Sequence, residues 1–234
     1  PASGRLTLQV GCQAAHGMRA GLAGLLGIAE DDLHVVVPDT GGGFGARAGI
    51  YPEFALALIA ARRLGQPVKW LADRSESFLS GYGARGNIST AELALDENNK
   101  FLGFRVHTIA NLGAYVASAS PNPAVNNIGT LAGVYTTPAI YVNITGVLSN
   151  ANPMAPYRGA GRPEAAYVIE RLVDKAAREM NVSANALRER NYIRASDMPY
   201  ETAMGLSYDS GEFARNLNDA LGDAGQSDVA SRRK

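Results

Sequence analysis

The chain has 234 residues, of which 46% are hydrophobic and 19% charged, and this suffices for one large domain or two ordinary domains with a core. Basic and acidic residues both number 22, so no net field attracts nucleic acid or an anionic membrane surface. The single cysteine, Cys12, excludes an internal disulfide and an iron–sulfur cluster held by cysteines of this chain. No apolar run approaches the roughly 20 residues of a membrane helix, and we expect a cytoplasmic protein.

The first third of the chain predicts strands alternating with helices. Residues 6–10 and 34–37 have the alternation or β-branching of strands, and residues 18–26 and 50–64 have helical spacing. Residues 68–71, with sequence VKWL, predict a third strand. This order favours helices packed on one side of a sheet.

Between the second strand and the second helix lies a glycine-rich stretch, residues 39–45, with sequence DTGGGFG. Four glycines in five positions remove Cβ atoms and allow positive φ, so consecutive N–H groups can point at one anionic group near a helix N-terminus. A Walker loop is absent, because Ala46, Arg47 and Ala48 stand where Gly-Lys-Ser/Thr would follow, and a dinucleotide-binding fingerprint would need Gly-x-Gly-x-x-Gly with an acidic residue about 20 residues on. A plain tight turn is the alternative, so the stretch predicts a polar ligand without identifying it.

Gln13 lies at the junction between the first strand and the first helix. Side chains at the carboxyl end of a strand are commonly presented to a ligand, which makes Gln13 a candidate binding residue. An exposed loop glutamine is the alternative.

After residue 87 the pattern becomes that of antiparallel strands. Residues 88–95 and 101–109 alternate and are joined by the turn sequence DENNK, which predicts a hairpin, and residues 138–148 predict another strand. Residues 110–135 are rich in small residues, and so long an aperiodic segment is usually functional or packed under a neighbour.

Residues 150–164 are the second unusual stretch. Prolines stiffen it, glycines leave Arg158 unshielded, and Pro163 stands in the first turn of a predicted helix. Such a loop is suited to an anionic group held at close range, with a proline-rich turn carrying solvated arginines as the alternative. Glu164, Glu170 and Glu179 are interpreted as solvated charges on helix faces.

Further helices are predicted over residues 184–193 and 211–221, the latter capped by Ser210. We therefore expect an α+β fold with helices packed on mixed or antiparallel sheets. Residues 1–222 are predicted to form one domain, with layers at about 1–86 and 87–222, and residues 223–234 a disordered tail.

Gln13, the glycine stretch and the Arg158 loop, in this order and spacing, resemble the molybdenum hydroxylase family, which comprises the large subunits of xanthine dehydrogenase, aldehyde oxidase and carbon monoxide dehydrogenase relatives. The likeness covers roughly residues 5–213 and includes the sequences DRSE at 73–76, GAY at 113–115, YRGAGRPE at 157–164 and RNYI at 190–193. The YRGAGR version resembles the second, less defined group of sequences labelled carbon monoxide dehydrogenase. The fold implied is that of the molybdopterin-binding domain of these enzymes.

The resemblance implies a molybdenum ion held through the dithiolene of a pterin, often its cytosine dinucleotide form, with no direct metal ligand from this chain. It places Gln13 beside an oxygen ligand of the metal. It also assigns cofactor-binding roles to Gly42, Gly43, Phe44, Gly45, Arg158 and Gly159, and substrate-pocket positions to Ala48, Asn126 and Ala160. Fixed N–H donors around a high-valent oxo centre can stabilise charge developing there, which agrees with the interpretation of the loops.

The reaction implied is hydroxylation of an aldehyde-like or heterocyclic substrate with oxygen from water. Electrons would leave through the pterin to an iron–sulfur subunit and a subunit carrying FAD, and the remainder of the large subunit would complete the site. The family's general-base glutamate lies in a segment that matches nothing here, so the catalytic residue is unknown and the fragment is expected to be inactive alone.

Departures from the family pattern bear on the substrate. Copper-containing carbon monoxide dehydrogenases have cysteine where Gly159 stands, which argues against that chemistry. Purine oxidisers have glutamate where Ala48 stands, an arginine near Asn126 and phenylalanine where Ala160 stands, which argues against xanthine. Two alternatives to an oxidoreductase stay open, a non-catalytic structural or assembly domain and a generic phosphate- or nucleotide-binding module.

Overall fold

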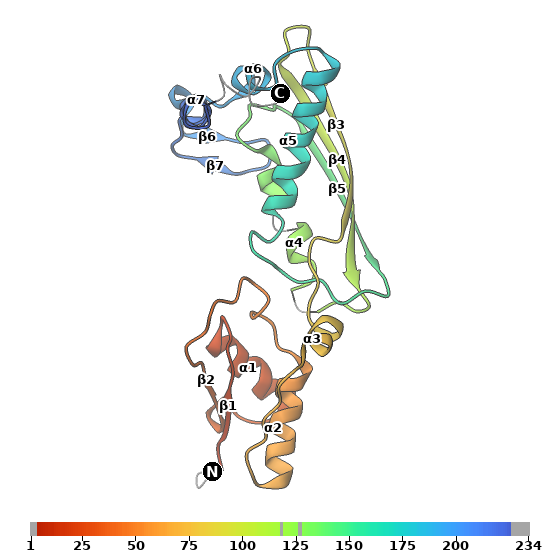
Figure 1. Cartoon of the computed structure of the whole chain (residues 1–234), viewed down its shortest axis with the longest axis vertical. Helices are drawn as coiled ribbons and strands as arrows, with labels where there is room; N and C mark the ends of the chain where they lie inside the picture. Colours follow the sequence, from red (N-terminus) through yellow and green to blue (C-terminus); the bar gives the residue numbers. More distant parts are fainter. Residues whose placement is uncertain (1–3, 118, 126–127, 226–234) are drawn as a thin grey trace. The chain divides into compact units, whose positions relative to one another are not determined.

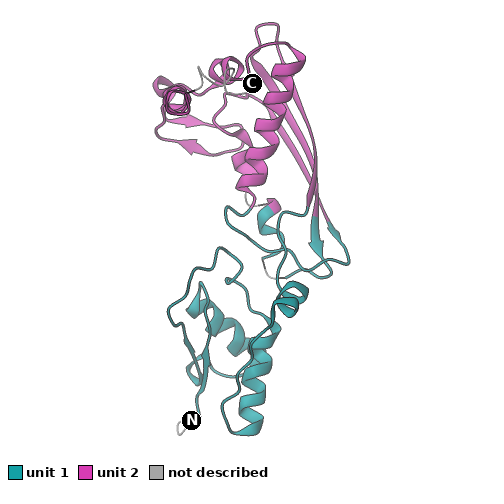
Figure 2. Ribbon diagram, viewed as in Figure 1, with its two compact units in different colours: residues 1–86, 111–123, 147–160 teal, residues 87–110, 124–146, 161–234 magenta. Residues whose placement is uncertain are grey.

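The structure is a computed structural model that describes residues 4–117, 119–125 and 128–225 (Figure 1). It divides into two compact units, and each takes several separate stretches of the sequence (Figure 2). Unit 1 comprises residues 1–86, 111–123 and 147–160, and unit 2 comprises residues 87–110, 124–146 and 161–234. The two units are thus interleaved along the chain, and the single domain with layers at about 1–86 and 87–222 stays a prediction. Helices and both parallel and antiparallel strand pairs are present, which confirms the α+β class.

Unit 1 begins with a strand, helix and strand in which the two strands are parallel. Strand β1 (Leu6–Gln9) pairs with β2 (Leu33–Val36), and helix α1 (Ala15–Leu26) makes the crossover that a parallel pair requires, followed by the short 3-10 helix η1 (Glu30–Asp32). Helix α2 (Pro52–Leu64) follows with proline in its first turn. These elements bury one apolar cluster, which includes Leu8, Met18, Leu22, Leu33 and Leu58.

The predicted strand at residues 68–71 is wrong. Among the described residues, no backbone hydrogen bond joins this segment to another strand, and Leu71 is 80% exposed. Alternation gives a segment the propensity for a strand, but a strand also needs a neighbour for its N–H and C=O groups. Helix α3 (Arg74–Ser80) follows, held at its start by a capping box between Asp73 and Glu76.

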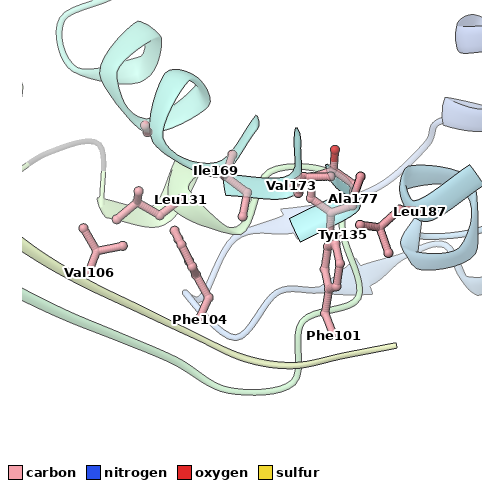
Figure 3. Packing of buried hydrophobic residues seen from close by; sticks show 10 residues of the cluster. Phe101, Phe104, Val106, Leu131, Tyr135, Ile169, Val173, Ala177 and Leu187 are labelled. Carbon is pink, nitrogen blue, oxygen red and sulfur yellow. The ribbon is translucent and has the colours of Figure 1, made fainter. Parts of the chain in front are cut away.

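Most residues of a three-stranded sheet of order β3-β4-β5 belong to unit 2, and the last residues of β4 and β5 belong to unit 1. Strands β3 (Asn87–Leu95) and β4 (Phe101–Gly113) form the predicted antiparallel hairpin, with Ile88 opposite Ile109. Strand β5 (Ile140–Leu148) matches the strand predicted over residues 138–148. Helix α5 (Arg162–Glu179) packs on this sheet. Figure 3 shows Phe101, Phe104 and Val106 of β4 in one cluster with residues of α5, namely Ile169, Val173 and Ala177.

The aperiodic stretch at residues 110–135 supplies part of the same cluster. It contains the short helices α4 (Asn122–Val125) and η2 (Ile128–Ala132), and Leu131 and Tyr135 are buried in the cluster. The interpretation that this segment is packed under a neighbour is therefore confirmed for these residues.

The C-terminal part of unit 2 is made of short elements. They are α6 (Ala184–Asn191), η3 (Ala195–Asp197), β6 (Tyr200–Glu201), β7 (Ser207–Tyr208) and α7 (Phe213–Asp223). The predicted Ser210 cap is wrong, because α7 begins at Phe213 and the Ser210 hydroxyl bonds to Asp209. Residues 226–234 of the predicted tail lie outside the described residues.

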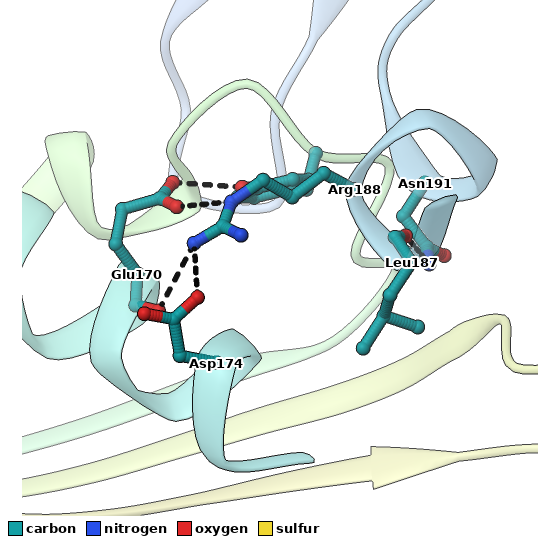
Figure 4. A network of polar contacts seen from close by, with 6 residues as sticks. Glu170, Asp174, Leu187, Arg188 and Asn191 are labelled. Carbon is teal, nitrogen blue, oxygen red and sulfur yellow. Dashed lines mark hydrogen bonds and ion pairs between the residues drawn. The ribbon is translucent and has the colours of Figure 1, made fainter. Parts of the chain in front are cut away.

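A polar network joins α5 to α6 (Figure 4). Arg188, whose side chain is only 14% exposed, donates to Glu170 at 2.7 Å and to Asp174 at 2.9 Å. The Tyr135 hydroxyl donates to Glu170 at 2.7 Å, and burial together with this carboxylate raises the pKa of Tyr135. The interpretation of Glu170 as a solvated charge holds only in part, because its side chain is 41% exposed but its carboxylate also accepts from Tyr135 and Arg188.

Candidate functional site

Gln13 lies in the loop between β1 and α1, and its side chain contacts the glycine-rich stretch. Its backbone N–H donates to the Arg47 carbonyl oxygen at 3.1 Å, and the Gly45 N–H donates to its side-chain Oε1 at 2.7 Å. Because Gly45 offers a donor, the amide oxygen of Gln13 must face it, and the Nε2 amide group remains available to donate elsewhere.

Two glycines of the stretch permit this close approach. A Cβ on Gly43 would lie 2.6 Å from Gln13 Oε1, and a Cβ on Gly45 would lie 2.8 Å from the Pro156 carbonyl carbon and overlap its oxygen. Gly45 also has φ of +88°, which side chains rarely adopt. Glycine at 43 and 45 thus lets three backbone segments meet.

The loop at residues 156–160 is the third of these segments. The Arg158 N–H donates to the Phe44 carbonyl oxygen at 2.9 Å, and the Arg158 guanidinium lies over the Phe44 ring at 5.6 Å. Gly159 and Ala160 both have positive φ, +89° and +46°, and the Ala160 N–H donates to the Tyr157 carbonyl at 2.8 Å. The structure therefore brings together, within unit 1, the three pieces that the sequence predicts to form one site.

The glycine stretch does not run directly into a helix. Residues 46–51 intervene before α2 begins at Pro52, and the ligand cradle near a helix N-terminus stays a prediction. Two tyrosines hold the intervening segment instead: Tyr51 donates to the Ala46 carbonyl at 2.9 Å and Tyr82 to the Ile50 carbonyl at 3.1 Å. Their rings stack at 4.6 Å, and burial raises the pKa of both hydroxyls, which keeps them protonated donors.

Of the three predicted substrate-pocket residues, the structure describes Ala48 and Ala160. Ala48 is exposed and donates its N–H to the Gly45 carbonyl at 3.1 Å, and Ala160 is half-buried in the 156–160 turn. Asn126 lies outside the described residues. The binding roles of these residues, and of Gln13, Gly42, Arg158 and Gly159, remain predictions.

In the described part of the chain, five backbone N–H groups at the site have no hydrogen-bond acceptor. Among residues 4–117, 119–125 and 128–225, no hydrogen-bond partner is present for the N–H groups of Gly41, Gly42, Gly43, Phe44 and Gly159. Backbone donors beside a glutamine amide suit the oxygen atoms of an anionic ligand, so this donor set fits an oxo or phosphate group.

The described residues contain no group of three or more His, Cys, Asp and Glu side chains that could hold a metal ion. No helix in the same part of the chain is both long and apolar enough to cross a membrane.

Arg85 contacts the site, although nothing in the sequence singles it out. It donates to the carbonyl oxygens of Tyr157 at 3.3 Å and Arg158 at 2.6 Å, and it lies over the Tyr157 ring. Its φ of +60° is unusual for a non-glycine residue. No periodicity or motif surrounds it in the sequence, so only the fold reveals these contacts.

Comparisons with known proteins identify the family of the chain. The family model described as the molybdopterin cofactor-binding domain matches residues 1–192, and the chain belongs to this family. The large chain of carbon monoxide dehydrogenase from Hydrogenophaga pseudoflava is 38% identical over 224 residues, which are 94% of this chain and 28% of that protein. The large subunit of nicotine 6-hydroxylase from Paenarthrobacter nicotinovorans is 36% identical, over 93% of this chain and 27% of its own length.

Solved structures show the same fold. Quinoline 2-oxidoreductase from Pseudomonas putida 86 superposes with a TM-score of 0.91 at 30% identity, over 99% of this chain and 30% of that one. Aldehyde oxidoreductase from Desulfovibrio desulfuricans has a TM-score of 0.85 at 21% identity, which is a likeness of fold alone. The chain thus spans less than a third of the length of these relatives.

Proposed function

We propose that this chain holds the molybdenum–pterin cofactor of a hydroxylating oxidoreductase between Gln13, the glycine stretch and the 156–160 turn. The observation that carries the proposal is the set of backbone N–H groups beside the Gln13 amide that have no partner among the described residues. When bound, the cofactor would supply a high-valent metal centre that takes two electrons from the substrate. The donors from the protein would face its anionic oxygen atoms.

Each residue has a distinct part in this proposal. Gly45 orients the Gln13 side chain, because the Gly45 N–H donates to Gln13 Oε1. The Nε2 group of Gln13 then faces the ligand. The N–H groups of Gly42, Gly43 and Phe44 line the same stretch and are fixed before the ligand arrives, so they stabilise negative charge without reorganisation. Arg158 adds a positive charge held over the ring of Phe44.

The proposed reaction is hydroxylation of an electron-poor carbon, in an aldehyde-like or heterocyclic substrate, with oxygen from water. The relatives named for nicotine and quinoline support the heterocyclic class. A cytosine dinucleotide form of the pterin, iron–sulfur and FAD partner subunits, a cytoplasmic location and inactivity of this chain alone complete the proposal. They derive from the family resemblance and from the short span of the chain.

Molybdenum and pterin analysis of the intact complex tests the proposal. Gln13→Glu retains an acceptor for the Gly45 N–H but removes the Nε2 donor and adds a negative charge beside an anionic ligand. We expect its molybdenum and pterin content to fall by about tenfold or more, since a hydrogen bond to a charged group is worth about 1.5–3 kcal/mol. Gln9→Glu, a matched change at an exposed position on β1, should leave both contents unchanged.

Two results would overturn the proposal. One is full molybdenum and pterin content in the Gln13→Glu complex. The other is a complex without pterin whose melting temperature rises with ordinary nucleotides, because a ligand of the folded state stabilises it by mass action. The second result would instead support a nucleotide-binding module.

A further inference from the structure

Arg85 lies on the side of the 156–160 turn toward which the Tyr157 and Arg158 carbonyl groups point. Its guanidinium donates to two consecutive carbonyl oxygens, those of Tyr157 at 3.3 Å and Arg158 at 2.6 Å. A guanidinium offers donors in a fixed planar fork, so a pair of such bonds fixes the orientation of both peptide groups.

The orientation of those peptides decides where their N–H groups point. The C=O and N–H of a trans peptide point in opposite directions, and among the described residues the only cis bond is Met198–Pro199. The peptide group between Tyr157 and Arg158 is held at both ends, because the Tyr157 carbonyl accepts from Arg85 and the Arg158 N–H donates to the Phe44 carbonyl. The peptide group between Arg158 and Gly159 is held at the Arg158 carbonyl, so its N–H, that of Gly159, points away from Arg85.

The Gly159 N–H is one of the donors without a partner in the described part of the chain. A positive charge bonded to the carbonyl oxygen also polarises the peptide group and makes its N–H a stronger donor. Arg85 thus both aims and strengthens this donor.

The local backbone is arranged to place Arg85 there. Gly83 and Met154 form an isolated bridge, in which the Gly83 N–H donates to Pro153 and the Ala155 N–H donates to Gly83, so residues 83–86 run beside the approach to the turn. Arg85 itself adopts φ of +60°, a conformation that costs energy for a residue with a branched or long side chain and that clusters at functional sites.

We propose that Arg85 is a positioning residue that holds the Gly159 N–H toward the molybdenum–pterin ligand. This inference rests on the function proposed above. Arg85 touches neither substrate nor cofactor in this account. It acts through the 157–159 peptides, and its backbone strain is explained by that role.

The test uses two substitutions in the intact complex. Arg85→Asn removes the guanidinium but suits the left-handed backbone, so the protein should still fold. Arg85→Lys keeps the charge but supplies a point charge on a flexible stem in place of the planar fork. Arg63→Gln removes an exposed arginine at the end of α2 and serves as the control.

The first readout does not need the cofactor. Amide hydrogen exchange of the segment at 157–160, measured in cofactor-free protein, should rise by about tenfold or more in Arg85→Asn and Arg85→Lys, and should not change in Arg63→Gln. Exchange that stays at the wild-type rate in Arg85→Asn would overturn the claim that Arg85 orders the turn.

The second readout is molybdenum and pterin retained after extended dialysis. We expect a loss of about tenfold in both Arg85 variants at unchanged global stability, with lysine giving no rescue. Retention equal to that of Arg63→Gln, despite faster exchange, would refute the positioning role, and full rescue by lysine would refute the part assigned to the planar fork. A wild-type complex without pterin would refute the proposed function, while the exchange result would still decide whether Arg85 orders the turn.

Discussion

Substituting alanine for Gly45 tests the close approach on which the site is built. A Cβ there meets two penalties, a φ of +88° and the backbone of Pro156, whose carbonyl carbon would lie 2.8 Å away. The left-handed conformation costs about 1–2 kcal/mol for a non-glycine residue. Displacing packed backbone costs about 1–3 kcal/mol more, for a total of about 2–5 kcal/mol.

Two other glycines separate these penalties. Gly65, at the end of α2, has φ of +67° and nothing within 4 Å of the position that a Cβ would take, so Gly65→Ala should cost only the conformational part, about 1–2 kcal/mol. Gly41 has neither a positive φ nor a neighbour within 4 Å, so Gly41→Ala should change stability by less than about 0.5 kcal/mol. The three variants thus isolate the contact with Pro156.

Urea unfolding followed by tryptophan fluorescence is the assay. The chain has one tryptophan, Trp70, which lies in the same unit as the loop and reports on it. With a slope of about 2 kcal/mol per molar urea, Gly45→Ala should lower the midpoint by about 1–2.5 M. A midpoint no lower than that of Gly65→Ala would refute the close packing of the glycine stretch against residues 156–158.

Three further changes test unit 2 and helix α3. Asn191→Ala should destabilise by about 3 kcal/mol or more in thermal or urea unfolding, because this fully buried amide satisfies three backbone groups that would be left unpaired; a cost below about 1 kcal/mol would contradict those contacts. Stability should fall above pH 10, since the unfolded Tyr135 ionises near its ordinary pKa of 10.0 while burial raises the pKa in the fold. Tyr135→Phe should lessen that fall and leave the part due to other tyrosines with a raised pKa, such as Tyr51 and Tyr82, and an unchanged alkaline slope would argue against the burial of Tyr135. Asp73→Ala should cost about 1 kcal/mol of local helix stability, measured as faster amide exchange at Glu76 with little change in global unfolding. Exchange at the wild-type rate would contradict the capping box.

Much of the fold follows from local patterns. The first two strands, the hairpin and helices α1, α2 and α5 are predictable because periodicity, turn residues and Pro163 act within a few residues of one another. The same reasoning fails where the outcome depends on a partner distant in sequence. Residues 68–71 have strand propensity and, in the described part of the chain, no strand to pair with, and Glu170 meets Arg188 only because α6 folds back along α5.

The candidate site is predictable in its location and not in its internal bonds. Residue type and position single out Gln13 and the glycine stretch, and the structure brings them within hydrogen-bonding distance. The engagement of the Gly45 N–H by Gln13, and the part taken by Arg85, depend on conformations with positive φ and on contacts between segments distant in sequence. Neither contact produces a periodic pattern in the sequence from which it could be predicted.

Anomalous diffraction at the molybdenum absorption edge, from crystals of the intact complex, tests the central claim most directly. The account predicts one molybdenum peak bordered by the Gln13 amide, the 42–45 backbone and the Gly159 N–H. A peak remote from these groups, with the three segments contacting only protein, would contradict it.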